Sequence, residues 1–246
     1  MSGFAGVARA ALRAMIYPPL ATTCFADYAF TGARSCIRQR VHWLRRSSAK
    51  HAKWLGFRIR VHGEIPSNGL IVSNHVSYLD ILALSTAATT AFVSKKEVAD
   101  WPLFGALAKM GATIFVDRER RGAVSDVAEE MHEHLDAGVP LVLFPEGTST
   151  DGSHVLPFRS SLFAPVVKLA CPLTACGLRY SLAGSSVPDE VAYWGDMSLA
   201  PHMGNLLRKT GLTVDIHFGP SHVRTSDRKT LARDLHAEVR ALAGLA

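Results

Sequence analysis

The chain has 246 residues, of which 48% are apolar and 20% are charged. This composition is that of a folded protein and excludes an intrinsically disordered chain, and the length allows one large domain or one domain with a small appendage. The four cysteines show no CxxC or other zinc spacing, so we interpret them as small apolar residues in a reducing compartment. They are Cys24, Cys36, Cys171 and Cys176.

The excess positive charge lies at the N-terminal end. Residues 1–64 contain eleven Lys and Arg and two acidic residues, a net charge of +9, whereas residues 65–246 contain sixteen basic and nineteen acidic residues. A localised basic segment favours an anionic surface as its partner, either lipid headgroups or nucleic acid. On charge alone, a solvated helical face is the alternative.

Residues 15–33 contain no Lys or Arg, which makes them the one candidate for a membrane span. They include Pro18, Pro19 and Asp27, whereas a span needs about 20 mostly apolar residues. An Asp near the middle of a span costs about 2.5–3.5 kcal/mol on insertion scales. The segment is therefore predicted not to form a single clean span, and its short apolar run is also a poor signal peptide.

Two helices are predicted before residue 57. The first covers about 18 residues and is expected to break or kink at Pro18 and Pro19. The second runs to about Leu55, with apolar residues near one stripe and basic residues elsewhere. This pattern indicates an amphipathic helix lying in a lipid interface, and packing on the chain's own domain is the alternative. The apolar residues are Ile37, Val41, Leu44 and Leu55, and the basic residues are Arg34, Arg38, Arg45 and Lys53.

From residue 57 onward, short apolar runs alternate with helical periods, with helices around residues 124–135 and from Ser226 or Asp227 to Gly244. This alternation predicts an α/β fold, here a single mixed-sheet sandwich domain over residues 57–246, preceded by the helical pair of residues 1–56. Sites in such folds gather at strand ends, where loops meet helix N-termini. The predicted strands are Phe57–Val61, Leu70–Ser73, Ala91–Ser94, Thr113–Val116, Leu141–Phe144, Leu173–Leu178 and Val214–Phe218.

The first candidate site follows the predicted strand at residues 70–73. Asn74 and His75 leave the strand end, and Asp80 opens the next helix five residues after the histidine. If the loop folds back, the Asp80 carboxylate reaches one imidazole nitrogen and fixes the tautomer, so that the other nitrogen can act as a base. The alternative is an Asp80 side chain that only caps the helix.

Charged residues also follow the predicted strand that ends at Val116. Asp117 and Arg118 come directly after it. This pattern is weak by itself, and an ordinary surface ion pair is the favoured interpretation.

A third candidate site follows the predicted strand that ends at Phe144. The strand continues into Pro145-Glu146-Gly147-Thr148, where glycine permits close approach of the backbone to a ligand and exposed amides can receive an anion. Arg159 places a cation before the next helical stretch. An ordinary strand-to-loop turn is the alternative for this segment.

Together, the three segments resemble the glycerolipid acyltransferase family, of which 1-acyl-sn-glycerol-3-phosphate acyltransferase is the best-known member. The family's NHxxxxD box matches residues 74–80, its FxxR-like box residues 115–118 and its FPEGT box residues 144–148. The boxes stand in the family order, each at a predicted strand end, and the resemblance covers about residues 57–220. The basic N-terminal helical pair is also similar to the one that some bacterial members use to sit on the membrane.

The chain departs from the family pattern at two places. Members that act on lysophosphatidic acid often continue FPEGT with an arginine for the substrate phosphate, and Ser149 stands at that position here. The later proline-rich box is represented only loosely by Cys171-Pro172-Leu173. The first departure makes a zwitterionic acceptor such as lyso-ornithine lipid an alternative, although Arg118 and Arg159 could still bind a phosphate.

The resemblance implies transfer of a fatty acyl group from acyl-CoA or acyl-carrier protein to the free hydroxyl of a lysolipid. The expected acceptor is 1-acyl-sn-glycerol-3-phosphate, which gives phosphatidic acid. His75 is expected to take the proton of the acceptor hydroxyl and Asp80 to orient His75, without a metal or a cofactor. Backbone amides near Gly147 are the candidates for stabilising the oxyanion, and Glu146 is expected to accept from an acceptor hydroxyl or to hold an arginine. The expected acceptor-binding residues are Arg118, Glu146, Gly147, Thr148 and Arg159.

The expected partners are the lysolipid, the acyl thioester donor and an anionic membrane surface bound through the basic helices, with no nucleic acid. The protein is expected at the cytoplasmic face of the cell membrane, peripheral or monotopic, with salt-sensitive binding. A serine hydrolase is a weak rival because no GxSxG occurs in the chain. A non-enzymatic binder would leave the three boxes unexplained. The aromatic segment Val191–Met197 is interpreted as a core edge.

Overall fold

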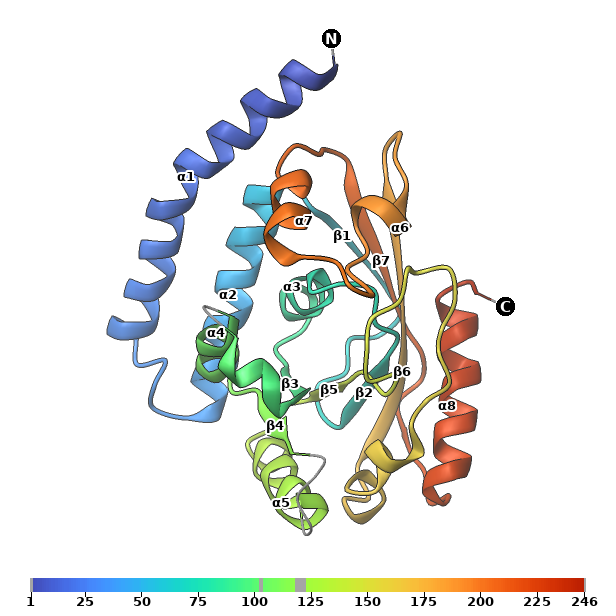
Figure 1. Cartoon of the computed structure of the whole chain (residues 1–246). Helices are drawn as coiled ribbons and strands as arrows, with labels where there is room; N and C mark the ends of the chain where they lie inside the picture. Colours follow the sequence, from blue (N-terminus) through green and yellow to red (C-terminus); the bar gives the residue numbers. More distant parts are fainter. Residues whose placement is uncertain (1, 102–103, 118–122, 246) are drawn as a thin grey trace.

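A mixed β-sheet forms the centre of the protein (Figure 1), of which the computed structural model describes residues 2–101, 104–117 and 123–245. In this part of the chain the sheet has eight strands, in the order β1-β7-β6-β2-β5-β3-β4, with β8 paired to β6. Neighbouring strands from β6 to β4 run parallel, β1 runs parallel to β7, and β6 and β7 are antiparallel. The strands are β1 (Arg58–His62), β2 (Leu70–Ser73), β3 (Ala91–Lys95), β4 (Ile114–Val116), β5 (Leu141–Leu143), β6 (Pro172–Leu182), β7 (Leu212–Phe218) and β8 (His222–Val223).

All seven predicted strands are present, and the predicted α/β fold with a mixed sheet is confirmed. β2 has the predicted bounds. β6 differs most, because it continues to Leu182 instead of ending at Leu178, and its antiparallel pairing with β7 extends over the added residues. The short strand β8 has no counterpart among the predictions, since its two residues, both exposed, are too few to show an apolar pattern.

Helices cover both faces of the sheet, and each face has its own hydrophobic core. Side chains alternate along a strand, so Leu70 and Val72 of β2 enter one core and Ile71 enters the other. β2 is therefore buried at every position, which accounts for its continuous apolar run. The helices are α1 (Ser2–Phe30), α2 (Ile37–Leu55), α3 (Leu79–Ala87), α4 (Phe104–Met110), α5 (Ala123–Asp136), α6 (Val187–Glu190), α7 (Leu199–Leu206) and α8 (Arg228–Leu242), with 3-10 helices at Lys96–Asp100, Ser160–Phe163 and Val166–Lys168.

The C-terminal helix α8 begins and ends as its sequence indicates. Asp227 is the N-cap, and its side chain accepts hydrogen bonds from the amides of Lys229 and Thr230. Gly244 follows the helix with a positive φ of 69°, a conformation that glycine adopts without strain. Of the two predicted caps, Asp227 is the one the structure uses.

α2 packs on the sheet domain instead of presenting its apolar stripe to lipid. Val41 is fully buried in the core that contains Leu70, and Leu44 and Leu55 pack against the core that contains Ile71. The expectation of an interfacial helix is therefore wrong for α2, and the alternative of packing on its own domain holds. α2 also packs closely on α3.

α1 continues through Pro18 and Pro19, so the predicted break is absent. The prolines cannot donate to the carbonyls of Ala14 and Met15, one turn earlier. Both of those residues are exposed, and the helix continues to Phe30 despite the two lost bonds. Among the described residues, none of the helices combines the length and the apolarity needed to cross a bilayer.

Arginines of the two N-terminal helices bind carbonyl groups at the ends of other helices. Arg13, only 8% exposed, donates to the carbonyls of Leu55, Leu207 and Lys209, at the ends of α2 and α7. The guanidinium groups of Arg38 and Arg40 bind carbonyls at the ends of α5 and α4 in the same way. The last carbonyls of a helix lack partners and carry partial negative charge, so these contacts are stabilising. Part of the N-terminal positive charge is thus used inside the protein.

Candidate active site

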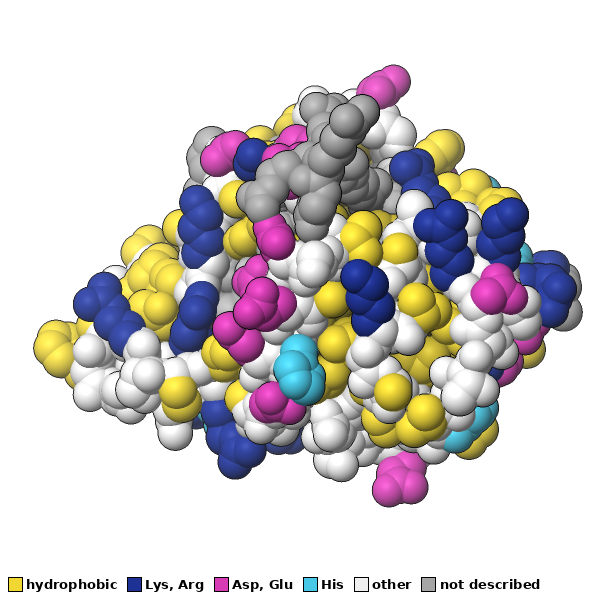
Figure 2. Space-filling model, turned by 90° about the horizontal axis from the view of Figure 1, so that it is seen from below, with side chains coloured by type: hydrophobic (Ala, Val, Ile, Leu, Met, Phe, Trp, Pro, Cys, Tyr) yellow, Lys and Arg dark blue, Asp and Glu magenta, His cyan; other side chains and the backbone are white. Residues whose placement is uncertain are grey.

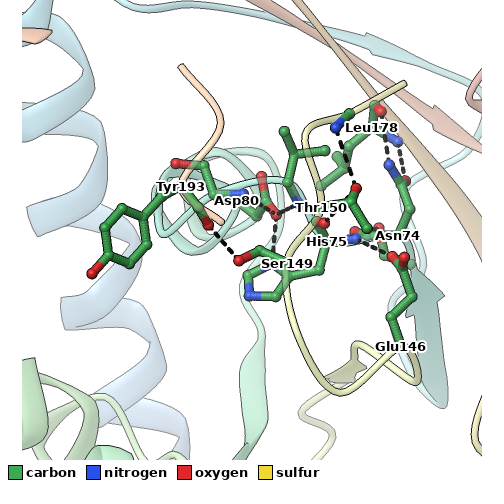
Figure 3. A network of polar contacts seen from close by, with 12 residues as sticks. Asn74, His75, Asp80, Glu146, Ser149, Thr150, Leu178 and Tyr193 are labelled. Atoms are coloured by element: carbon green, nitrogen blue, oxygen red, sulfur yellow. Dashed lines mark hydrogen bonds and ion pairs between the residues drawn. The ribbon is translucent and has the colours of Figure 1, made fainter. Parts of the chain in front are cut away.

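His75 and Asp80 form a hydrogen-bonded pair at the end of β2 (Figure 3). His75 lies in the loop after the strand and Asp80 in the first turn of α3, and their Nδ1 and Oδ2 atoms are 2.6 Å apart. The Asp80 side chain is fully buried, whereas that of His75 is 23% exposed. Since the carboxylate accepts from Nδ1, the Nε2 atom is the one that can take a proton from a substrate.

The Asp80 carboxylate is held by four donors. Besides His75, the amides of Val76 and Ser77 donate to Oδ2 at 2.7 and 3.1 Å, and the Tyr180 hydroxyl donates to Oδ1 at 2.6 Å. A fully buried carboxylate needs such partners to offset its desolvation. Asp80 therefore orients His75 and also holds the backbone of the loop before α3. It is not the cap of that helix, whose N-cap residue is Tyr78 and which has no side-chain capping bond.

The imidazole ring of His75 lies on an aromatic support. It stacks on Phe144 at the end of β5, with ring centroids 4.3 Å apart and an angle of 19° between the planes. Phe144 in turn stacks on Phe92 of β3. The ring plane is thus fixed from one side while Asp80 fixes its rotation, which is the geometry of an oriented general base.

Asn74 attaches the loop to the long central strand β6. Its side-chain amide donates to the Leu178 carbonyl at 3.0 Å and its side-chain carbonyl accepts from the Leu178 amide at 2.7 Å. These two bonds take the place of a further pair in the parallel ladder, which ends at Ser73. The chain can therefore leave the sheet at His75 without leaving buried backbone groups unpaired.

Glu146 holds the backbone of the same loop. Its side chain is 2% exposed, and its two oxygens accept from the amides of His75 and Leu156, both at 2.7 Å. Burial raises the pKa of Glu146 to about 7, and the two amide bonds only partly oppose this rise. In this arrangement each oxygen that was expected to receive an acceptor hydroxyl already accepts a backbone amide.

The other residues of the Pro145–Thr148 turn lie around Glu146. Gly147 has a positive φ of 75°, and its amide donates to the Phe144 carbonyl at 3.1 Å, so this amide is engaged in the turn and not directed at a ligand. Thr148 is exposed. Arg159 is also exposed, and its amide donates to the Pro145 carbonyl at 2.9 Å, which brings it to the turn.

The predicted FxxR-like segment lies only partly within the described residues. Asp117 forms an ion pair with Lys96, with Nζ and Oδ2 3.0 Å apart. Arg118, expected to bind the acceptor, lies outside the described residues.

The segment after α6 forms a core edge, as its sequence indicates, since Val191 and Ala192 are fully buried, and it also contacts the site. Ser149 donates its hydroxyl hydrogen bond to the Tyr193 carbonyl, and the Tyr193 amide donates to the Val76 carbonyl at 3.0 Å (Figure 3). The Tyr193 ring lies edge-on to Tyr78 and His202. The signal in the sequence was the aromatic and partly polar run Val191–Met197, but nothing local indicates that it lies next to residue 76.

One cluster in the part of the chain that the structure describes has the composition of a metal site. His62, Asp215 and His217 each offer a ligand atom, and these atoms lie within 4.8 Å of one another. Asp215 Oδ1 already bonds His62 Nε2 at 2.8 Å and lies 4.0 Å from the Arg60 guanidinium, whose charge repels a cation. We assign no metal to this cluster, which β6 separates from the His75 loop.

A partly exposed imidazole oriented by a buried carboxylate, at a strand end of an α/β sheet, is typical of an enzyme that activates a hydroxyl or a water by general-base catalysis. Comparisons with known proteins narrow this class. Residues 58–179 match the Acyltransferase family. The lyso-ornithine lipid O-acyltransferase of Brucella abortus is 39% identical over 207 residues, which cover 78% of each chain. The enzyme of the same name from Rhizobium meliloti is 37% identical and covers 76% of this chain and 69% of its own.

More distant similarities agree with this family. The 1-acyl-sn-glycerol-3-phosphate acyltransferase of Neisseria gonorrhoeae is 27% identical, over 73% of this chain and 71% of its own. The crystal structure of the 1-acyl-sn-glycerophosphate acyltransferase from Thermotoga maritima superposes with a TM-score of 0.68 over 100% of this chain and 98% of that chain, at 17% identity, which shows a shared fold. This chain belongs to the glycerolipid acyltransferase family, as its NHxxxxD and FPEGT boxes predict.

Proposed function

We propose that the protein transfers a fatty acyl group from a thioester to the free hydroxyl of a lysolipid, with His75 as the general base. The observation that carries the proposal is the 2.6 Å bond between His75 Nδ1 and Asp80, which leaves Nε2 as the available nitrogen of a partly exposed side chain. The family membership supports the acyl transfer, and the names of the relatives support a lysolipid acceptor.

The proposed step needs only this chain and its two substrates. The acceptor oxygen forms a bond to the thioester carbonyl carbon while its proton moves to His75 Nε2. Asp80 stabilises the imidazolium that forms. As the carbon–sulfur bond breaks, the proton returns to the leaving thiolate. A positioned base of this kind contributes typically about 10²- to 10⁴-fold to the rate. No metal or prosthetic group takes part in the proposal, and either acyl-CoA or acyl-carrier protein could supply the thioester.

We propose lyso-ornithine lipid as the acceptor, in preference to 1-acyl-sn-glycerol-3-phosphate. Two observations favour it. Four relatives named lyso-ornithine lipid O-acyltransferase are 36–39% identical over 76–83% of this chain. Relatives named 1-acyl-sn-glycerol-3-phosphate acyltransferase are either 27% identical over 73% of it or 37% identical over only 37% of it. In addition, Ser149 occupies the position of the expected phosphate-binding arginine, and its hydroxyl is bound to the Tyr193 carbonyl.

A membrane surface is proposed as the place of the reaction, with α1 in contact with lipid. Its exposed apolar residues lie on one side of the helix, opposite the buried Arg13 and Cys24. In Figure 2 hydrophobic side chains and cations gather at the left end of the molecule, the side that α1 occupies in Figure 1. This pattern is typical of a helix in a bilayer interface. The residues are Phe4, Val7, Leu12, Met15, Ile16, Phe25 and Phe30.

The reaction is tested by transfer of a labelled acyl group from acyl-CoA to each lysolipid in parallel. We expect product with lyso-ornithine lipid, and loss of at least about 10²-fold in the His75→Ala variant, which should remain folded. Product only with 1-acyl-sn-glycerol-3-phosphate would reverse the choice of acceptor and leave the reaction type intact. Near-normal turnover by His75→Ala, or free fatty acid released without an acceptor, would overturn the proposed mechanism.

A further inference from the structure

The Asp80 carboxylate has one oxygen that faces away from the loop, and a residue of β6 binds it. Oδ2 accepts hydrogen bonds from His75 Nδ1 and from two amides of the loop, whereas Oδ1 accepts one from the Tyr180 hydroxyl at 2.6 Å. Tyr180 lies 100 residues from Asp80 in the chain. The orientation of the carboxylate about its own axis thus depends on a contact outside the NHxxxxD segment.

Tyr180 is itself firmly placed. Its side chain is buried, and its ring stacks on Phe57 with centroids 6.0 Å apart and planes 15° apart. Its backbone lies in the antiparallel pairing of β6 with β7, opposite Val214. Two residues earlier, Leu178 carries both hydrogen bonds to Asn74. β6 therefore binds the His75 loop at Asn74, and it binds the Asp80 carboxylate through Tyr180.

Building on the proposed chemistry of His75, we infer that Tyr180 is a positioning residue of the transfer reaction: its hydroxyl holds the Asp80 carboxylate so that Oδ2 stays directed at His75 Nδ1. Tyr180 touches neither substrate in this role and acts only through Asp80. Hydrogen bonds to a charged acceptor are stronger and more directional than neutral ones, so a single buried hydroxyl is sufficient for it.

The hydroxyl is suited to donate at any working pH. Burial, and next the charge of Asp80, hold the pKa of Tyr180 well above its usual range, so the group stays protonated. The other titratable groups that act on this cluster are Glu146 after β5, Cys176 on β6 and Tyr78 in the loop before α3. Burial raises the pKa of Cys176 to about 12 and raises the pKa of Tyr78 further still. Both groups therefore stay neutral near pH 7.

Removal of the hydroxyl has a defined electrostatic consequence. Oδ1 would be left buried and without its donor, so the negative charge of Asp80 would be less stabilised. A less stabilised carboxylate attracts a proton on the neighbouring imidazole more strongly. The acid side of the pH–activity profile should therefore move to higher pH, and the base should also be less well oriented.

The test compares the full-length protein with Tyr180→Phe, which keeps the ring on Phe57, and with Thr174→Val as the matched control. The Thr174 hydroxyl is buried on the same strand and makes no hydrogen bond among the described residues. In Tyr180→Phe we expect the acid midpoint of the profile to rise by about half a pH unit, kcat to fall about tenfold and both KM values to stay unchanged. Thr174→Val should behave as the unmodified protein.

Incorporation of 3-fluorotyrosine at position 180 provides a second measurement, which decides the matter if Tyr180→Phe is unstable in thermal unfolding. The fluorinated hydroxyl is a stronger donor, so the acid midpoint should move downward, in the opposite direction. An unchanged profile, a loss confined to KM, or an equal loss in Thr174→Val would overturn the inference. If His75→Ala is inactive while Tyr180→Phe is normal, the positioning role of Tyr180 is wrong and the proposed mechanism stands. If His75→Ala is active, the proposed mechanism fails.

Discussion

The Glu146 carboxylate is buried between two backbone amides, and among the described residues no cation bonds to it. Burial therefore decides its protonation, and its pKa of about 7 exceeds the ordinary value of 4.5 in an unfolded chain. The folded protein thus binds this proton more tightly than the unfolded chain does. Its contribution to stability is fully present below pH 4.5 and is lost as the pH rises through 7.

The Glu146→Gln variant should remove this pH dependence, because the amide does not titrate. Between pH 5 and pH 8, we expect the free energy of unfolding of the unmodified protein to fall by about 2–3 kcal/mol more than that of the variant. The glutamine side chain can accept a hydrogen bond from only one of the two amides. The variant should therefore be less stable than the unmodified protein by a similar amount at every pH. Urea unfolding at several pH values measures the difference.

The control for this experiment is Glu129→Gln, which removes the same charge from an exposed position on α5. Its stability should follow that of the unmodified protein across the pH range. Parallel curves for Glu146→Gln and the unmodified protein would show that Glu146 does not titrate in this window.

His75 and Asp80 could be predicted from the sequence because they lie five residues apart in one loop, where the chain itself limits their separation. Their supports could not be predicted in the same way. Tyr180 and Tyr193 reach the loop through strand pairing and through a turn of the chain about 100 residues later, and no spacing rule links them to Asp80. The sequence marks Glu146 as an acid at a strand end, but its role depends on burial, which a strand-end motif does not reveal.

At the scale of elements, α8 approaches β6 so closely that only glycine fits between them. A Cβ on Gly177 would lie 2.3 Å from the Ala243 amide nitrogen and 2.4 Å from the Leu242 carbonyl carbon. Both are backbone atoms, so a side chain there would displace the end of the helix. We expect Gly177→Ala to lower the free energy of unfolding by about 2–3 kcal/mol, measured by urea unfolding.

Gly204→Ala is the matched control for Gly177. Gly204 is exposed within α7, and a Cβ there would meet nothing within 4 Å. Because alanine favours a helix over glycine, this variant should gain about 0.5–1 kcal/mol. Equal stability of the two variants would mean that α8 can move away from β6 without cost.

The strands of the sheet were predictable for a physical reason. β2 is covered on both faces, so its first three residues form a continuous apolar run that marks the strand in the sequence. The placement of the N-terminal helices was not predictable in this way. An apolar stripe such as that of Val41 and Leu44 fits a protein core and a lipid surface equally well, and the stripe itself contains nothing that distinguishes the two.

For the whole molecule, the proposed membrane contact rests on α1, since the apolar stripe of α2 packs in the core. Phe4, Met15 and Phe30 are 85%, 74% and 88% exposed. Burying a side chain of this size stabilises binding by about 1.5–3 kcal/mol. A triple substitution of these residues by serine should therefore weaken binding to anionic vesicles at least about 100-fold, measured by co-sedimentation.

The control substitutes serine at Val124 and Val223, which are exposed apolar residues of α5 and β8, and should leave vesicle binding unchanged.

Salt separates the two contributions to binding. Charge attraction is screened within about 10 Å at 0.1 M salt, whereas apolar burial is not. The unmodified protein should lose part of its binding at high salt, and the triple variant should lose nearly all of it. If α1 serves only for docking, the triple variant should also acylate a short, soluble acceptor at the normal rate. Vesicle binding that survives the three substitutions at high salt would place the membrane contact on another surface of the protein.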